Sequence, residues 1–161
     1  MIPIRLATTK DATEIAKMSR DFIESGLGWS WDRPRVVRSV RDPDTTVAVS
    51  TSEENISGFA IMIFREHSAH LNLLAVKPTH RREGVGRDLV RWLEESARTA
   101  GTFELSLEVR ETNRAAQAFY QHLGYHRSGK IKGYYQHAES AIRMTRNISV
   151  LKKPRPGGRH R

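Results

Sequence analysis

The sequence predicts one domain of the mixed α/β class, built around a mainly antiparallel central sheet. Patterns typical of strands and helices alternate along its 161 residues in the order β-α-α-β-β-β-α-β-α-β-β. Three strand patterns follow one another between residues 46 and 76 with only short polar turns between them, which favours antiparallel pairing. No internal repeat or linker divides this order, and a chain of this length suits a single domain.

The first third of the chain is expected to form a strand and two helices. Residues 2–7 have the strand pattern, and Thr8 or Thr9 can cap the helix that follows. Apolar side chains recur in that helix at helical spacing, at Ile15, Met18, Phe22 and Ile23. Residues 26–31 (Gly-Leu-Gly-Trp-Ser-Trp) read as a loop, and Asp32-Arg33-Pro34 is typical of the start of a second short helix.

The middle of the chain is expected to form the meander and a long helix. The three strands are expected at residues 46–49, 56–65 and 71–76. Apolar residues then fall on one face of a helix that ends at Gly101: Val85, Leu89, Val90, Leu93 and Ala97.

The C-terminal part is expected to hold a strand, a helix and two closing strands. Residues 104–110 alternate as a strand does, and a helix is expected between a cap at Asn113 and the glycine at position 124. Residues 125–135 and 140–144 read as the closing strands.

A basic tail is expected after the domain. The chain carries a formal net charge of +9, and residues 151–161 contain five lysines and arginines and no acid. Proline, glycine and like charges disfavour a packed structure there. We therefore divide the chain into a domain of residues 1–147, which is only mildly basic, and a disordered tail of residues 148–161.

The composition excludes several kinds of site. The chain has no cysteine, so disulfides, a cysteine nucleophile and cysteine zinc sites are excluded. Its beginning lacks the apolar segment of a secretion signal, and the longest apolar run, residues 59–64, is too short to span a bilayer. Neither His67 nor His70 stands in a convincing cluster with carboxylates, so no metal site is expected. We expect a cytoplasmic protein without membrane contact.

The segment Arg-Arg-Glu-Gly-Val-Gly-Arg, residues 81–87, lies where the long helix begins. The first N–H groups of a helix lack partners within it and carry partial positive charge. Glycines let the backbone approach a ligand closely, and arginines attract anions, so the segment suits a phosphate or pyrophosphate. A tight strand-to-helix turn is an equally simple explanation of the glycines. The segment is neither a Walker loop nor the dinucleotide fingerprint, because the former needs Gly-Lys-Ser/Thr and the latter a third glycine.

Two motifs about two dozen residues apart carry a family resemblance. Residues 81–86 have the form R-x-x-G-x-G, and residues 112–125 read Thr-Asn-x-x-Ala-x-x-x-Tyr-x-x-x-Gly-Tyr. They resemble motifs A and B of the GNAT superfamily of N-acetyltransferases, and the likeness covers about residues 2–146. It implies the GNAT fold, in which the fourth and fifth strands splay apart. Leu107-Glu108-Val109-Arg110-x-x-Asn113 and Gly133-Tyr134-Tyr135 further resemble the ribosomal-protein alanine N-acetyltransferase branch, which the first third does not obviously match.

The resemblance implies acetyl-CoA as the acetyl donor and a set of residues that hold it. In the family, motif A binds the pyrophosphate of coenzyme A, and the preceding strand hydrogen-bonds the pantetheine arm through its main chain. One backbone N–H near Leu74 would face the thioester oxygen. The residues expected to contact the donor are Leu74, Ala75, Val76, Arg81, Arg82, Glu83, Gly84, Val85, Gly86, Arg87, Asn113, Ala116 and Phe119. Asn113 can also be a plain helix cap, and Glu83 must point its side chain away from the phosphates.

Tyr120 and Glu108 are the candidate catalytic residues. By the resemblance, Tyr120 reaches the sulfur and protonates the leaving thiolate, which a phenol with a pKa of about 10 can do. The alternative is a tyrosine of the core. Alternation in strand 104–110 places Glu108 on the face opposite its leucines, where it could take the proton of the amine, directly or through a water. The alternative is a structural carboxylate paired with an arginine.

The leading function is therefore an acetyl-CoA-dependent N-acetyltransferase whose acceptor amine attacks the thioester directly. The acceptor is either a protein or peptide N-terminus or a small-molecule amine. One alternative is a nucleic-acid- or ribosome-associated protein that uses the basic tail. Another is a GNAT domain that binds acyl-CoA without catalysis. The sequence leaves open the donor's acyl length and the choice between monomer and homodimer.

Overall fold

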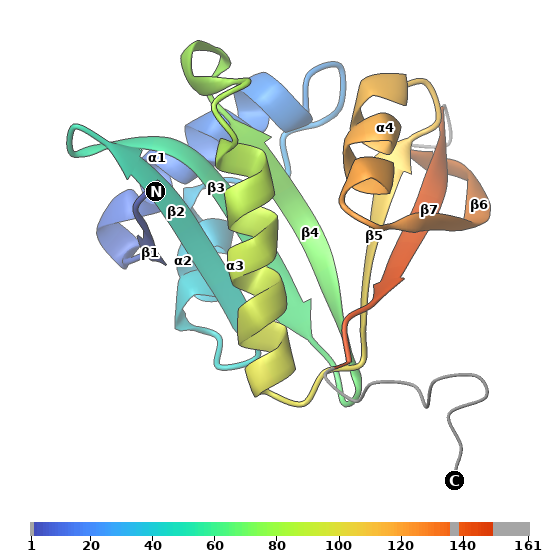
Figure 1. The fold of residues 1–161 in the computed structure, drawn as a ribbon. Helices are drawn as coiled ribbons and strands as arrows, with labels where there is room; N and C mark the ends of the chain where they lie inside the picture. Colours follow the sequence, from blue (N-terminus) through green and yellow to red (C-terminus); the bar gives the residue numbers. More distant parts are fainter. Residues whose placement is uncertain (1, 136–138, 150–161) are drawn as a thin grey trace, which may run out of the picture.

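In a computed structural model, which describes residues 2–135 and 139–149, seven strands form one sheet with helices on both faces (Figure 1). The strand order is β1-β2-β3-β4-β5-β7-β6. The strands are β1 (Ile4–Leu6), β2 (Thr45–Ser52), β3 (Asn55–Phe64), β4 (Ser68–Val76), β5 (Glu104–Arg110), β6 (His126–Tyr135) and β7 (Glu139–Asn147). The helices are α1 (Ala12–Met18), α2 (Arg33–Arg41), α3 (Val85–Thr99) and α4 (Arg114–His122), with short 3-10 turns at Thr9–Asp11 and Pro78–His80 and a π turn at Ser19–Ile23.

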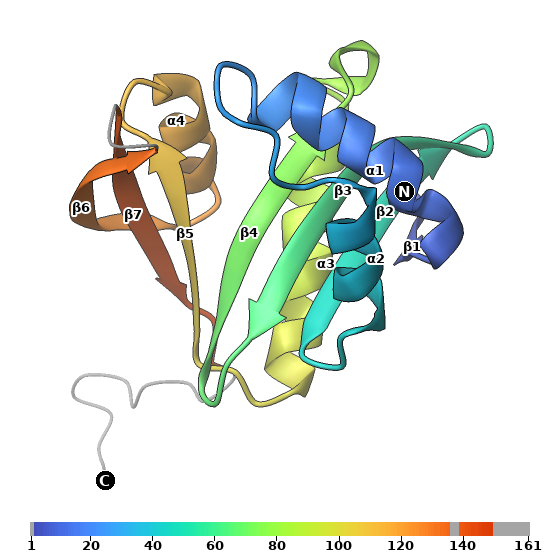
Figure 2. The same ribbon diagram turned by 180° about the vertical axis from the view of Figure 1, so that it is seen from behind.

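Two apolar layers hold the sheet between the helices. Helices α1 and α2 cover one face, and α3 covers the other (Figures 1 and 2). On the α3 side, Leu89 and Leu93 pack on the sheet with no exposed surface, and Ile15 and Val36 do so on the α1–α2 side. Strand β3 is buried almost without interruption, because both of its faces are covered.

Strands β4 and β5 form the only parallel pair among the described strands, and they separate soon after they meet. Their pairing runs from Ser68 with Glu104 to Leu71 with Leu107 and then stops. Beyond that point β4 continues beside β3, while β5 stays paired with β7 along its whole length. The two strands therefore diverge as the arms of a V, visible between β4 and β5 in Figure 1. The predicted mixed fold with splayed fourth and fifth strands is confirmed.

The elements follow the predicted order, and the differences lie at their ends. Strand β4 begins at Ser68, three residues before the expected Leu71, and β2 continues past the expected end at Val49 to Ser52, the first residue of a segment that reads as a polar turn. Polar side chains there do not prevent pairing, because the neighbouring strand supplies the hydrogen bonds. The first helix continues after Met18 as a π turn.

The chain is packed slightly beyond the expected domain end at residue 147. Ile148 is buried in the core, its N–H donates to the carbonyl of Phe103, and its own carbonyl accepts from Arg98. The expected tail of residues 148–161 lies outside the described residues except for Ile148 and Ser149. Among the described helices, none is long and apolar enough to cross a membrane.

Candidate active site

The two glycines at the start of α3 serve different purposes. Gly84 has φ +83°, in the left-handed region, and Arg82 two residues earlier has φ +68°. These conformations turn the chain from β4 into α3. Gly86 has ordinary backbone angles, but a Cβ there would lie 3.2 Å from the ring of Phe119, so the glycine allows α4 to approach α3. The turn and the close approach thus each account for one glycine.

The loop of residues 81–87 presents backbone donors and arginines. Within the described residues, none of the N–H groups of residues 82–87 has a backbone or side-chain acceptor. Arg81 donates to the carbonyl of Val76 at 3.3 Å, and Arg87 pairs with Asp88 at 3.2 Å. The Glu83 carboxylate contacts His80 Nδ1 at 3.1 Å. The loop is therefore a concentration of unpaired donors and cationic side chains.

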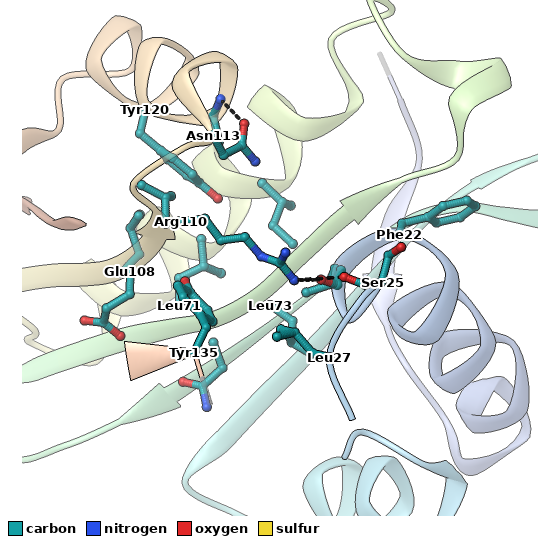
Figure 3. A pocket seen from close by; sticks show the side chains of 16 residues that line it. Phe22, Ser25, Leu27, Leu71, Leu73, Glu108, Arg110, Asn113, Tyr120 and Tyr135 are labelled. Carbon is teal, nitrogen blue, oxygen red and sulfur yellow. Dashed lines mark hydrogen bonds between the residues drawn. The ribbon is translucent and has the colours of Figure 1, made fainter. Parts of the chain in front are cut away.

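The divergence of β4 and β5 opens a first cavity of about 330 Å³ (Figure 3). Its lining includes five of the expected site residues: Leu74, Glu108, Asn113, Ala116 and Tyr120. Among these, Leu74 lies beyond the last β4–β5 pair, so its edge of β4 is left without a neighbouring strand. The V of the sheet thus brings both candidate catalytic residues and three of the expected donor contacts to one space.

The other expected donor contacts lie outside the lining of that cavity. The side chain of Ala75 packs in the α1–α2 layer, so only its main chain is left for the β4 edge. Val76 is partly buried against the α3-side core, and Phe119 packs against Gly86. The residues of the loop at 81–87 are likewise absent from that lining.

Asn113 is both a helix cap and part of the cavity wall. Its Oδ1 accepts from the N–H of Ala116 at 3.0 Å, which satisfies one donor of the first turn of α4. Its amide nitrogen has no acceptor among the described residues. Thr112 does not share the cap, since its hydroxyl donates to Glu139.

The Tyr120 hydroxyl is directed into the first cavity. Its ring is held edge-on by Phe119 and Tyr125, at centroid distances of 4.9 and 5.7 Å. The residue is only 7% exposed, and its hydroxyl has no hydrogen-bond partner in the described part of the chain. Figure 3 shows the oxygen facing the open space. Burial, with a smaller contribution from Tyr135, raises the pKa of Tyr120, so the phenol stays protonated.

Glu108 lies in the cavity wall and is also paired with cations. Its Oε1 lies 2.6 Å from His70 Nε2, and its Oε2 accepts from Arg143 Nε at 3.0 Å. The hydroxyl of Tyr134 donates to Oε1 at 3.3 Å. Burial alone raises the pKa of Glu108, but the hydrogen bonds and charges of His70 and Arg143 outweigh it, so the pKa is lowered. Glu108 therefore both lines the cleft and pairs with an arginine, so the two alternatives expected from the sequence occur together.

His70 is a site residue that the sequence did not reveal. Its Nδ1 lies 2.6 Å from Asn72 Oδ1, and its Nε2 equally close to the carboxylate of Glu108. With the Asn72 amide oxygen and the Glu108 carboxylate as its neighbours, each ring nitrogen faces an acceptor, which favours the imidazolium form. Burial lowers the pKa of His70, but Glu108 and Asn72 raise it by more. Sequence patterns did not indicate the pairing of His70 with Glu108, because β4 and β5 are neighbours only through a long-range parallel pairing.

A second cavity of about 320 Å³ meets the first on the side of α2. The residues common to both linings include Leu71, Leu73, Glu108 and Tyr135, and those found only in the second include His70, Trp31 and Arg35. In Figure 3 the carboxylate of Glu108 is turned away from Tyr120. The candidate acid therefore faces the first cavity, and the candidate base stands where the two cavities join.

A buried carboxylate orders the loop above these cavities. Glu24 accepts hydrogen bonds from the Ser19 hydroxyl, from the N–H and hydroxyl of Ser30, and from the N–H of Trp31, at 2.7–3.4 Å. Burial raises the pKa of Glu24, but these donors together lower it. From the other arm of the V, Arg110 donates to the carbonyls of Ile23 and Ser25 (Figure 3). Sequence patterns gave no sign of either contact.

The comparisons with known proteins agree with this architecture. The model of the acetyltransferase (GNAT) family matches residues 12–125. A [ribosomal protein bS18]-alanine N-acetyltransferase of Salmonella typhimurium is 37% identical over 103 residues, which is 62% of this chain and 70% of that protein. An aminoalkylphosphonate N-acetyltransferase of the same organism is 26% identical over 131 residues, 78% of this chain and 85% of that protein.

A solved structure extends the likeness over nearly the whole chain. The crystal structure of the ribosomal-protein-S18-alanine N-acetyltransferase from Escherichia coli superposes with a TM-score of 0.78 at 28% identity. The match covers 95% of this chain and 97% of that one. The family match spans the loop of residues 81–87, the V-shaped opening and helix α4. The chain belongs to the acetyltransferase (GNAT) family.

Proposed function

We propose that the protein transfers the acetyl group of acetyl-CoA to a primary amine, which attacks the thioester directly. One observation carries the proposal: a buried phenol without a hydrogen-bond partner among the described residues, Tyr120, and a carboxylate, Glu108, line the same cavity between the arms of the splayed sheet. The proposal includes the expected cytoplasmic location.

The loop and the β4 edge are suited to the two ends of the donor. The N–H groups of residues 82–87, which have no acceptor within the described part of the chain, and the exposed arginines favour its pyrophosphate. The open edge of β4 beyond Leu71 offers main-chain groups to the amide-containing pantetheine arm, as to an added strand. Asn113, whose amide nitrogen in the cavity wall has no acceptor among the described residues, offers one more polar contact.

The reaction needs two proton transfers that the two candidate residues can perform. The amine nitrogen forms a bond to the carbonyl carbon, the carbon–sulfur bond breaks, and the amine proton passes to the Glu108 carboxylate, directly or through a water. The Tyr120 hydroxyl gives its proton to the leaving sulfur. A phenol whose pKa burial has raised remains protonated for that step.

The acceptor enters, in this proposal, from the second cavity, where Glu108 and His70 meet. The relatives act on different amines: the name of one gives a ribosomal-protein alanine, and that of the other an aminoalkylphosphonate. Both a peptide N-terminus and a small amine therefore stay within the proposal. The nucleic-acid alternative rests on the tail, which lies outside the described residues, and stays a prediction.

The first experiment measures the melting temperature with acetyl-CoA, free CoA and NADH. A ligand that binds only the folded chain raises that temperature by mass action. We expect a shift with acetyl-CoA and CoA and none with NADH. Transfer is then followed as amine-dependent thiol release with peptides and small amines. Donor binding without transfer to any amine would favour the non-catalytic alternative, and the absence of donor binding would contradict the proposal.

A further inference from the structure

We propose that Arg35 binds an anionic group of the acceptor, so that the preferred substrates are primary amines that carry a carboxylate or phosphonate close to the amine. The inference rests on the proposed function and concerns the second cavity. Its evidence is the placement of the Arg35 side chain, the pairing of the other charges and the position of Glu108.

Arg35 is held in one orientation. Its guanidinium carbon lies 3.7 Å from the ring centroid of Trp31, which is only 8% exposed. The main chain of Trp31 is held in place, because its backbone N–H donates to the buried carboxylate of Glu24. Stacking occupies the flat face of a guanidinium and leaves its edge, which carries the N–H donors, free for an anion.

The Arg35 guanidinium has no counter-charge in the described part of the chain. Its N–H donors contact no carboxylate or carbonyl there, although the residue is half-buried and lines the second cavity. The carboxylate of Asp32, one turn earlier, accepts instead from the backbone N–H of Arg35 as the cap of α2. A fixed, half-buried guanidinium without a partner is suited to a charged ligand.

The other charged side chains that line this cavity all have hydrogen-bond partners. Glu24 is bonded to donors from Ser19, Ser30 and Trp31. Glu108 and His70 are bonded to each other, and Arg143 supplies a further positive charge to Glu108. Arg35 is therefore the one charged group of this lining whose side chain has no hydrogen-bond or ion-pair partner among the described residues.

The arrangement suggests how an acceptor lies. An amine placed beside Glu108, at the junction with the first cavity, leaves the rest of the molecule in the space bounded by Arg35. The volume of about 320 Å³ is small for a ligand pocket. It suits a short amino acid or aminophosphonate, or the first residues of a peptide with an acidic side chain.

The test compares matched acceptors on three proteins: wild type, Arg35→Gln and Arg38→Gln. Arg38 lies on the same helix and is exposed, so it controls for charge alone. The acceptors are Ala-Asp-amide against Ala-Asn-amide, and 2-aminoethylphosphonate against ethanolamine. The peptide pair and the small-molecule pair distinguish the two sources of the anion.

We expect the acidic member of at least one pair to have the lower KM with wild type. Arg35→Gln should raise that KM by about 10- to 100-fold, the effect of losing a charge-assisted hydrogen bond. It should change the KM of the neutral member little, and Arg38→Gln should change neither. Equal KM values within both pairs, or an equal rise for acidic and neutral acceptors, would overturn the proposal.

A binding measurement separates this proposal from the proposed function. Titration calorimetry of the same acceptors, with CoA present, detects the Arg35 contact without turnover. If the acidic acceptors bind and Arg35→Gln abolishes their advantage, while no amine is acetylated, the subsite stands and the proposed function fails. If acetylation occurs without preference for acidic acceptors, the proposed function stands and the Arg35 subsite fails. Arg35→Lys, which keeps the charge but not the planar fork, should bind with intermediate affinity.

Discussion

The imidazole of His70 and the carboxylate of Glu108 meet at 2.6 Å where the sheet begins to open. The last residues that β4 and β5 pair are Leu71 and Leu107, so the contact lies at the apex of the V. Both side chains line the cavity on the α2 side, and Glu108 also lines the cavity beside Tyr120. The charge state of this pair therefore bears on both stability and proton transfer.

His70→Gln should lower stability mainly at mildly acidic pH. The pKa of His70 is raised from 6.5 and that of Glu108 is lowered from 4.5. The contribution of His70 to the free energy of unfolding is complete below pH 6.5 and is lost as the pH rises through the folded-state pKa of His70. That of Glu108 is complete above pH 4.5 and is lost as the pH falls through its folded-state pKa. The pair thus stabilises the fold fully between these values, by about 1–3 kcal/mol.

Urea unfolding of wild type and His70→Gln across the pH range checks this. The groups facing the pair are Arg143, Tyr134 and Arg65, and they remain in both proteins. His67→Gln is the control, because His67 lies three residues earlier, in the connection between β3 and β4, and is exposed. A stability difference that grows as the pH rises above 6.5 would contradict the assigned charges.

Glu24→Gln should loosen the loop above the second cavity without changing donor binding. The Glu24 carboxylate accepts hydrogen bonds from the backbone N–H groups of Ser30 and Trp31. The glutamine amide group would place its own N–H donors against these N–H groups. We expect a loss of about 1–3 kcal/mol in the free energy of unfolding, because buried donors lose an acceptor. The acceptor KM should rise while the Kd of CoA stays constant. Asp21→Asn, at an exposed ion pair nearby, should change neither quantity measurably.

Gly84→Ala should weaken CoA binding beyond what backbone strain explains. Its φ of +83° disfavours alanine by about 1 kcal/mol, and a Cβ would lie 2.6 Å from the Arg87 guanidinium, which must then move. Gly101→Ala is a matched control at the other end of α3, with φ +82° and nothing within 4 Å of the added Cβ. Equal stability losses are expected, and calorimetry with CoA should find weaker binding only for Gly84→Ala. Unchanged CoA affinity would show that the loop does not hold the donor.

Most of the fold could be predicted from the sequence, because its helices and strands are specified by residues that lie close together in the chain. The cap at Asp32, the alternation of 104–110 and the apolar face of α3 each depend on residues close in sequence. The family motifs added the splay of β4 and β5, which short-range patterns do not specify.

The missed features depend on contacts between distant segments. His70 and Glu108 are 38 residues apart, and Arg110 reaches the carbonyl of Ile23 over 87 positions. The role of Glu24 depends on how a glycine-containing loop turns back on a π turn. Periodicity and capping rules contain no information on such contacts, so the pairing of His70 with Glu108 and the bonds of Arg110 and Glu24 could not be predicted from the sequence.

Tyr120→Phe and Tyr125→Phe form a matched pair that separates chemistry from stability. Tyr120 has no hydrogen-bond partner among the described residues, whereas the Tyr125 hydroxyl donates to the fully buried Glu94 at 2.8 Å. Removal of the Tyr125 hydroxyl should cost about 1–3 kcal/mol of stability and leave turnover nearly intact. Removal of the Tyr120 hydroxyl should cost little stability and lower kcat by about 10²- to 10⁴-fold, the usual effect of losing a general acid.

The most direct single measurement is the rate of amine-dependent thiol release from acetyl-CoA by Tyr120→Phe, with the donor and an accepted amine both saturating. The proposed mechanism predicts a large fall in kcat for this variant, with unchanged CoA affinity and an unchanged melting temperature. A kcat equal to that of wild type at every pH would show that Tyr120 does not protonate the leaving sulfur and would contradict the central claim.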